Sequence, residues 1–226
     1  MTILFQDRFE SGTLLTSEEP AGAWDSKAGT IAIDATAAKS GTYSAKVTAA
    51  TSGIVFKSFT DSTTLYNRGY YRFDNINETN WNNHEFIRNT GNSGANRISY
   101  VELQKHNDAA GIFKWFIHVL SGAGTADSPG AAVTIDTTHW YCVELKTVVH
   151  ASAGECRLYI DGVETQTLTE LDTDAQGAVD STYHGLPYLG AGVDTVHVDS
   201  VVISDAYIGP ESFITNHGDG LNWMVY

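Results

Sequence analysis

The sequence predicts an all-β protein that forms one domain, with its strands in two packed sheets or a closed barrel. Nearly every segment is a short run of β-branched or aromatic residues with alternating polarity, and clusters of Gly, Asn, Asp and Ser separate the runs. No window of about a dozen residues shows the 3.6-residue apolar period of a helix. A chain of 226 residues is long enough for one large β unit around a single core.

The predicted strands follow one another along the whole chain. We expect them over residues 3–5, 30–33, 44–48, 54–59, 69–75, 84–89, 98–104, 113–120, 139–149, 155–160, 163–168 and 195–204. So many strands in one domain require two packed sheets or a barrel. The Asp161-Gly162 pair predicts a two-residue hairpin turn, because Gly accepts a positive φ.

The remaining segments are predicted to be connections. Residues 121–130 are small and Gly-rich, and residues 170–181 are acidic and polar, so both are expected to be surface loops. A short helix is expected near residues 210–216, because Pro210 suits a first helical position. Cys142 and Cys156 are expected to be free thiols, since two cysteines are too few for a disulfide framework.

The charge of the chain excludes two classes of partner. Thirteen Lys and Arg against 27 Asp and Glu give a net charge of −14, which repels phosphate backbones and anionic membranes. We therefore expect neither nucleic acid nor membrane as a partner. Residues 1–7 have no basic region and no apolar core of a secretory signal, so we expect synthesis in the cytoplasm. The final location stays open between a virion and the cell surface or exterior.

Several short motifs point to a known superfamily. They are residues 5–12 with Trp24 and residues 40–47, then residues 140–145 and 157–163, and finally residues 198–204. Together they resemble the concanavalin A-like lectin and glucanase superfamily, which includes laminin G-like domains and jelly-roll polysaccharide lyases. The resemblance covers residue 5 to about residue 210 and implies a two-sheet antiparallel jelly-roll sandwich. It bears on function only by analogy, because the motifs are structural.

The resemblance also implies a metal. In similar carbohydrate-binding jelly rolls a structural Ca²⁺ ties the first strand to the last, which places Asp7 or Glu10, a carbonyl near residues 40–41, and Asp199 around the ion. Oxygen ligands and an acidic chain fit this chemistry. The alternative is that these carboxylates cap turns or face solvent.

The strands between residues 69 and 120 divide their side chains between two faces, because side chains alternate along a strand. The apolar set is expected in the core: Tyr71, Phe73, Val101, Leu103, Phe113, Trp115, Ile117 and Val119. The opposite set is expected to bind ligand on the exposed face of one sheet: Tyr70, Arg72, His84, Arg88, Tyr100, Glu102, Gln104, Lys114 and His118.

This predicted face mixes rings with polar groups, as sugar recognition requires. Its three cations, Arg72, Arg88 and Lys114, favour an acidic polysaccharide. The alternative is an ordinary solvent-facing sheet, which also carries polar residues at every second position.

Catalysis is less well supported by the sequence. Arg72, Gln104, His118 and Tyr100 supply the group types that uronate β-elimination needs, but the Arg-x-Glu-Leu, Gln-x-His and Tyr-Phe-Lys motifs of similar alginate lyases are absent. The nearest match to the glucanase Glu-x-Asp-x-(x)-Glu motif, at residues 170–174, ends in Asp within a predicted loop. The sequence therefore favours a non-catalytic protein.

Three functions remain open. The first is a lectin-like carbohydrate-binding protein. The second is a virion structural protein, such as a capsid decoration or tail-associated protein, that assembles as an oligomer. The third is a polysaccharide lyase. Residues 211–226 support the virion structural protein, because Leu221 and residues 223–226 are apolar and follow a Gly-Asp-Gly break. We expect this tail to pack back on the domain or to dock on a neighbour.

Overall fold

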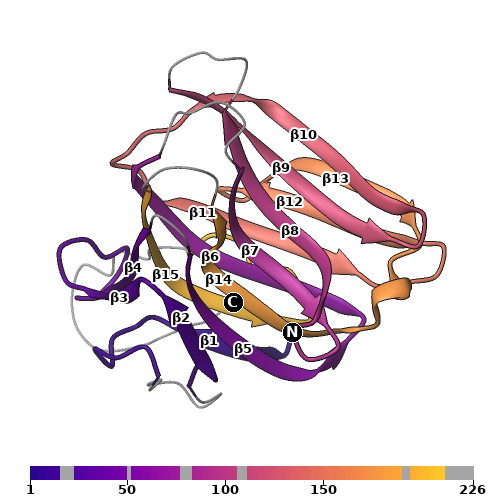
Figure 1. The fold of residues 1–226 in the computed structure, drawn as a ribbon, viewed down its shortest axis with the longest axis horizontal. Coiled ribbons are helices and arrows are strands. Elements are labelled where there is room, and N and C mark those ends of the chain that lie inside the picture. Colours follow the sequence, from indigo (N-terminus) through magenta and orange to yellow (C-terminus); the bar gives the residue numbers. More distant parts are fainter. Residues whose placement is uncertain (16–22, 50–51, 77–82, 106–110, 190–193, 212–226) are drawn as a thin grey trace, which may run out of the picture.

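Two antiparallel sheets pack face to face around one hydrophobic core (Figure 1). A computed structural model describes residues 1–15, 23–49, 52–76, 83–105, 111–189 and 194–211. The predicted two-sheet antiparallel sandwich is confirmed, and the closed barrel is wrong. None of the helical residues in these ranges forms a segment long and apolar enough to cross a membrane.

The first sheet contains the last strand of the chain beside the first. In spatial order it contains β13 (Val163–Leu171), β12 (Gly154–Ile160), β11 (Tyr141–Val148), β6 (Thr64–Asn75), β15 (Asp194–Ser204), β4 (Ser44–Ala49) and β3 (Ile31–Asp34). The remaining strand, β1 (Ile3–Asp7), pairs with the second half of β15. The expected return of the last strand to the first is therefore present.

The second sheet carries the strands that matter for the site. In spatial order it contains β10 (Gly124–Thr134), β9 (Ile112–Ser121), β8 (Asn96–Lys105), β7 (Asn83–Gly91), β14 (Val179–Leu189), β5 (Gly53–Ser62) and β2 (Ser26–Gly29). A short 3₁₀ turn, Asp174–Gln176, precedes β14.

All twelve predicted strands are present, but three strands escaped prediction: β2, β10 and β14. The loop predicted over residues 121–130 is wrong, because β10 begins at Gly124 and pairs with β9. The loop predicted over residues 170–181 is shorter than expected, since β14 begins at Val179. Neither strand shows clear alternation: β10 is a mostly exposed edge, and β14 buries polar residues such as Ser181 and Thr182.

The helix predicted near residues 210–216 is not present where the structure describes it. Of the helix predicted near residues 210–216, residues 210 and 211 are described and are not helical. Residues 212–216 lie outside the described ranges, as does the tail from residue 212 to 226. That the tail packs back on the domain or docks on a neighbour stays a prediction.

The apolar set of the mid-chain strands is buried, as predicted. All eight of its members, from Tyr71 on β6 to Val119 on β9, are at most 5% exposed. The rings of Phe73 on the first sheet and of Phe86 and Trp115 on the second meet at centroid distances of 5.4 to 6.0 Å. Since one face of each sheet is used for this packing, ligands are left with the two outer faces.

A buried polar network also joins the two sheets. Asn67 on β6 donates through Nδ2 to Oδ1 of Asn89 (2.8 Å) and to Oγ1 of Thr182 (2.6 Å). Its Oδ1 lies 2.7 Å from Nε2 of His184, and Nδ1 of that ring lies 2.6 Å from the Tyr71 hydroxyl. Because a buried polar group without a partner is costly, this network favours one relative placement of the sheets.

The two cysteines are free and buried, as expected. In the strand pairing Cys142 lies opposite Tyr70, whereas Cys156 lies opposite Thr147. Burial raises the pKa of each thiol to about 12, so neither is a reactive thiolate near neutral pH.

The Asp161-Gly162 turn joins β12 to β13 as predicted, with Ile160 paired to Val163. Both turn residues have positive φ, 52° and 82°. A Cβ on Gly162 would lie 2.9 Å from Pro210. We expect Gly162→Ala to lower the free energy of unfolding by about 1–3 kcal/mol in urea denaturation, through backbone strain and this contact.

Gly12→Ala is a matched control for this prediction. Gly12 also has a positive φ, 70°, but a Cβ there would meet Tyr43 only at 3.8 Å, an ordinary contact. Gly12→Ala should therefore lower the free energy of unfolding by less than Gly162→Ala does. Equal losses for the two variants would contradict the role assigned to Pro210.

Candidate functional site

One row of side chains crosses the outer face of the second sheet from β5 to β10. Each member lies directly opposite the next in the strand pairing. We call this the aromatic row, and its members are Phe56, Tyr183, Arg88, Tyr100, His118 and Asp127. The six strands that carry it lie side by side in Figure 1.

Ring contacts join the members of the row in two groups, one from Phe56 to Arg88 and one from Tyr100 to His118. The rings of Phe56 and Tyr183 have centroids 4.9 Å apart, and the Arg88 guanidinium lies 5.6 Å from the Tyr183 ring. The Tyr100 and His118 rings stack at 4.6 Å with an interplanar angle of 13°. Phe56, Tyr183 and Tyr100 are all half-buried, so each ring is held by its neighbours and still reaches solvent.

Two carboxylates hold the His118 ring. Its Nδ1 lies 2.6 Å from Oδ1 of Asp127, and its Nε2 lies 2.8 Å from Oε2 of Glu102. Burial opposes the charged imidazolium, but the nearby carboxylates of Glu102 and Asp127 outweigh it and raise the pKa of His118. Neither ring nitrogen is therefore placed to take a proton from a substrate.

A second pair of carboxylates lies beside the row. Glu85 on β7 is directly opposite Glu102 on β8, and the two residues are 1% and 3% exposed. Arg88 contacts both oxygens of Glu85, Nη2 to Oε2 at 2.7 Å, and Gln104 donates to Glu102 at 2.7 Å. The charges on this part of the face are thus matched within the protein.

The environment of Tyr100 keeps its hydroxyl protonated. Burial is the main cause, and the negative charges of Glu102 and Glu85 add to it, so the pKa of Tyr100 rises to about 12. The hydroxyl therefore stays neutral across the physiological range.

The structure corrects the predicted ligand-binding set. Six of its nine members share the outer face of the second sheet: Arg88, Tyr100, Glu102, Gln104, Lys114 and His118. Tyr70 and Arg72 lie on β6 in the first sheet, and His84 is buried opposite the core residue Leu103. Alternation assigns a side chain to one side of its strand, but it does not reveal which sheet the strand joins.

Two physical features explain these errors. The chain crosses from the first sheet to the second after β6, so Arg72 and Arg88 lie on opposite outer faces of the sandwich. A register shift between Glu85 and Ile87 then turns Glu85 outward and His84 inward. The proposed lyase group of Arg72, Gln104, His118 and Tyr100 is therefore not one site, and the three predicted cations are not gathered on one face.

Other residues of the site were missed by the sequence interpretation. Tyr183 lies on β14, which was not predicted, and Asp127 lies on β10, which was predicted to be a loop. Glu85 was missed because of the register shift. Phe56 lies within a predicted strand, but nothing in the sequence pairs it with Tyr183.

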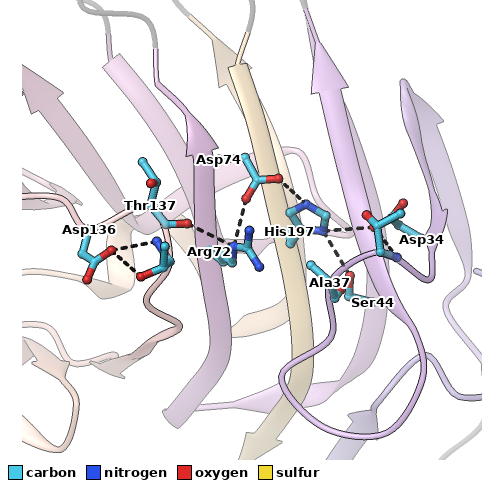
Figure 2. A network of polar contacts seen from close by, with 10 residues as sticks. Asp34, Ala37, Ser44, Arg72, Asp74, Asp136, Thr137 and His197 are labelled. Atoms are coloured by element: carbon cyan, nitrogen blue, oxygen red, sulfur yellow. Dashed lines mark hydrogen bonds and ion pairs between the residues drawn. The ribbon is translucent and has the colours of Figure 1, made fainter.

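The polar cluster around Arg72 is structural (Figure 2). Arg72 Nε donates to the carbonyl of Thr137 at 3.1 Å and lies 2.9 Å from Asp74. The His197 ring lies between two partners: its Nε2 is 2.9 Å from Oδ2 of Asp74, and its Nδ1 is 3.2 Å from the Ser44 hydroxyl. This Ser-His-Asp order resembles a hydrolase triad, but Ser44 and His197 are 0% exposed and the Ser44 hydroxyl donates to the Ala37 carbonyl.

Tyr70 is equally committed to the fold. It is almost fully buried, and its hydroxyl accepts the backbone N–H of Glu211 at 2.6 Å. Neighbouring Glu144 accepts the N–H groups of Ile208 and Gly209. These contacts bind residues 208–211 to the outer face of the first sheet.

The carboxylates predicted to bind calcium accept protein hydrogen bonds. Asp7 accepts the Phe9 amide and the Trp24 indole, and Glu10 accepts the amides of Thr42 and Tyr43. Asp199 accepts the amides at positions 39, 40 and 200, and burial raises its pKa to about 7.

Within the described ranges no three His, Cys, Asp or Glu side chains are grouped so as to hold a metal ion. The contacts of Asp7, Glu10 and Asp199 fit the alternative in which they cap turns. Calcium binding stays a prediction.

No protein-family model matches the sequence, and no curated protein matches it. Solved structures do resemble it. The cellulose induced protein Cip1 is 17% identical with a TM-score of 0.59, and the match covers 92% of this chain and 100% of Cip1. The botulinum neurotoxin serotype D binding domain is 10% identical with a TM-score of 0.61, over 92% of this chain and 49% of that one.

A third similar structure is described as showing that cell entry of botulinum neurotoxin type C depends on two ganglioside molecules. It is 10% identical with a TM-score of 0.62, over 89% of this chain and 47% of that one. The chain shares their jelly-roll fold. It spans about half the length of the toxin domains. Identities this low show the fold alone, and membership of the concanavalin A-like superfamily stays a prediction.

Proposed function

We propose that this protein is a non-catalytic carbohydrate-binding jelly roll whose ligand lies along the aromatic row. The observation that carries the proposal is the alignment of six paired side chains across six strands, in which the partly exposed rings of Phe56, Tyr183 and Tyr100 lie in one line with Arg88 and with the paired His118 and Asp127. Strands lie about 4.8 Å apart, so five spacings make a row of roughly 24 Å. A surface of that length suits an oligosaccharide better than a single sugar.

The row supplies both kinds of contact that a sugar needs. The rings of Phe56, Tyr183 and Tyr100 can stack on the C–H faces of pyranose rings, and the neutral Tyr100 hydroxyl can hydrogen-bond sugar hydroxyls. Ion pairs and ring contacts fix these side chains before any ligand arrives. Such preorganisation lowers the conformational entropy lost on binding.

The same contacts argue against catalysis. Both nitrogens of His118 face carboxylates, and Glu85 is paired with Arg88. General acid–base chemistry needs a group that is free to exchange a proton with the substrate. The ganglioside-dependent toxin structure and the cellulose-induced protein, both of this fold, are consistent with a carbohydrate ligand. Assembly into a virion stays a prediction that no described contact favours.

The proposal predicts a strong effect of Tyr100→Ala. Loss of one central stacking ring should weaken glycan binding at least tenfold, or about 1.4 kcal/mol, in affinity electrophoresis or calorimetry with a panel of soluble polysaccharides. Tyr207→Ala is the matched control, because Tyr207 is 44% exposed and contacts Tyr66 and Tyr159 of the first sheet. The glycan affinity of the Tyr207→Ala variant should equal that of the unmodified protein.

Two outcomes would contradict the proposal. One is the absence of binding to every neutral and acidic polysaccharide of the panel. The other is an equal loss of affinity for the Tyr100 and Tyr207 variants, with both proteins shown to be folded by circular dichroism.

A further inference from the structure

We propose that the aromatic row selects a neutral glycan and discriminates against uronate polymers. This inference rests on the glycan-binding function proposed above and names the ligand class of the same site. It differs from the sequence-based expectation of an acidic polysaccharide, which assumed that Arg72, Arg88 and Lys114 share one face.

Both basic side chains of the row, Arg88 and His118, are already paired with carboxylates. Arg88 forms a two-point contact with Glu85. Arg97, beside the row, lies 4.0 Å from the same carboxylate and 5.5 Å from the Tyr100 ring, and its side chain is 42% exposed. His118 is enclosed by Glu102 and Asp127. Recognition of a uronate carboxylate generally uses a guanidinium or ammonium group with free donors. Arg88 and His118 would each have to leave a carboxylate partner to supply one.

Lys114 is the cation of this face with no ion pair among the described residues, and it lies far from the row. It is on β9 with the same side-chain direction as His118, four residues away. At about 3.3 Å per residue this separation is roughly 13 Å. Lys114 therefore lies to one side of the row and is not a member of it.

Of the carboxylates next to the row, the exposed Asp127 is the one that would repel a second negative charge. Glu85 and Glu102 are buried beside Tyr100, and a further carboxylate, that of Asp127, has a side chain that is 51% exposed at the end of the row. Carboxylate oxygens accept hydrogen bonds from neutral hydroxyl groups, which every neutral sugar carries. The net charge of −14 adds repulsion at longer range against any polyanion.

The test compares oligosaccharides of equal length. Hexamers of β-1,4-linked glucose, xylose and mannose, and hexamers of glucuronic, galacturonic and mannuronic acid, would be titrated by calorimetry at two salt concentrations. We expect at least one neutral hexamer to bind ten times more tightly than any uronate, with an affinity that does not change with salt. A uronate that binds more tightly, by a salt-weakened interaction, would overturn the inference and leave glycan binding intact.

Failure of the whole proposed function gives a different result. If no hexamer of either class binds, and a wider glycan panel also shows no binding, the function and the inference fail together.

A charge-removing variant provides an independent check. Asp127→Asn should raise the ratio of uronate to neutral affinity at least threefold, because it removes the exposed negative charge at the end of the row. Asp61→Asn, at an exposed position near the end of β5, makes the same change in net charge away from the aromatic row and should leave the ratio unchanged. An unchanged ratio for Asp127→Asn would overturn the inference, since Asp127 is exposed and its replacement should not disturb folding.

Discussion

Replacing Asn67 by Ala should lower the free energy of unfolding by about 3 kcal/mol, one of the two largest effects expected in this protein. The change removes two hydrogen bonds donated to Asn89 and Thr182 and the acceptor that faces His184. Each buried partner left unsatisfied costs about 1–3 kcal/mol. The losses do not simply add, because part of the network can rearrange. Urea denaturation with linear extrapolation measures the change.

Asn96→Ala is the matched control for this prediction. Asn96 is half-buried, and its amide makes a weak contact, 3.5 Å to the Gln176 carbonyl. Asn96→Ala should therefore lower the free energy of unfolding by less than about 1 kcal/mol. Asn67→Leu separates hydrogen bonding from packing, because it refills the volume and still leaves the partners unsatisfied. A variant at position 67 that is as stable as the Asn96 variant would show that the network does not join the sheets as described.

The same network shows what the sequence could predict about the core. The burial of Val101, Trp115 and Ile117 follows from simple alternation, and it holds because each strand has one face against the other sheet. Asn67, Asn89 and His184 are polar, so no hydrophobic pattern identifies their positions as buried. Their burial depends on finding one another across the two sheets, which is information that no single strand contains.

The candidate site depends on long-range pairing in the same way. Tyr100 and His118 lie on consecutive strands, so their proximity could be expected from a hairpin-like arrangement of β8 and β9. Tyr183 meets Arg88 only because β14 returns between β5 and β7 from nearly a hundred residues later in the chain. The error at Arg72 has the same origin, since sheet membership is decided by non-local pairs.

Acid should destabilise this protein through His184, the other large effect we expect. Burial lowers the pKa of His184 from 6.5 to about 3 in the folded state, whereas the unfolded chain binds the proton below about 6.5. The contribution of His184 to stability therefore falls as the pH drops from about 6.5 towards 3, by at most about 1.4 kcal/mol per pH unit, or roughly 4 kcal/mol in total. Asp199 has the opposite sign, because its folded pKa is raised to about 7 and its contribution falls as the pH rises from about 4 to 7.

Comparison with a His184→Gln variant isolates the histidine, because the Asp199 contribution is common to both proteins. The variant should be less stable at pH 7, since it loses the ring that packs against Trp24 and Tyr71. The stability gap should narrow by roughly 4 kcal/mol between pH 6.5 and pH 3.5, as only the unmodified protein carries the proton-linked penalty. Parallel curves for the His184 variant and the unmodified protein would mean that His184 is protonated, or reaches water, in the folded state.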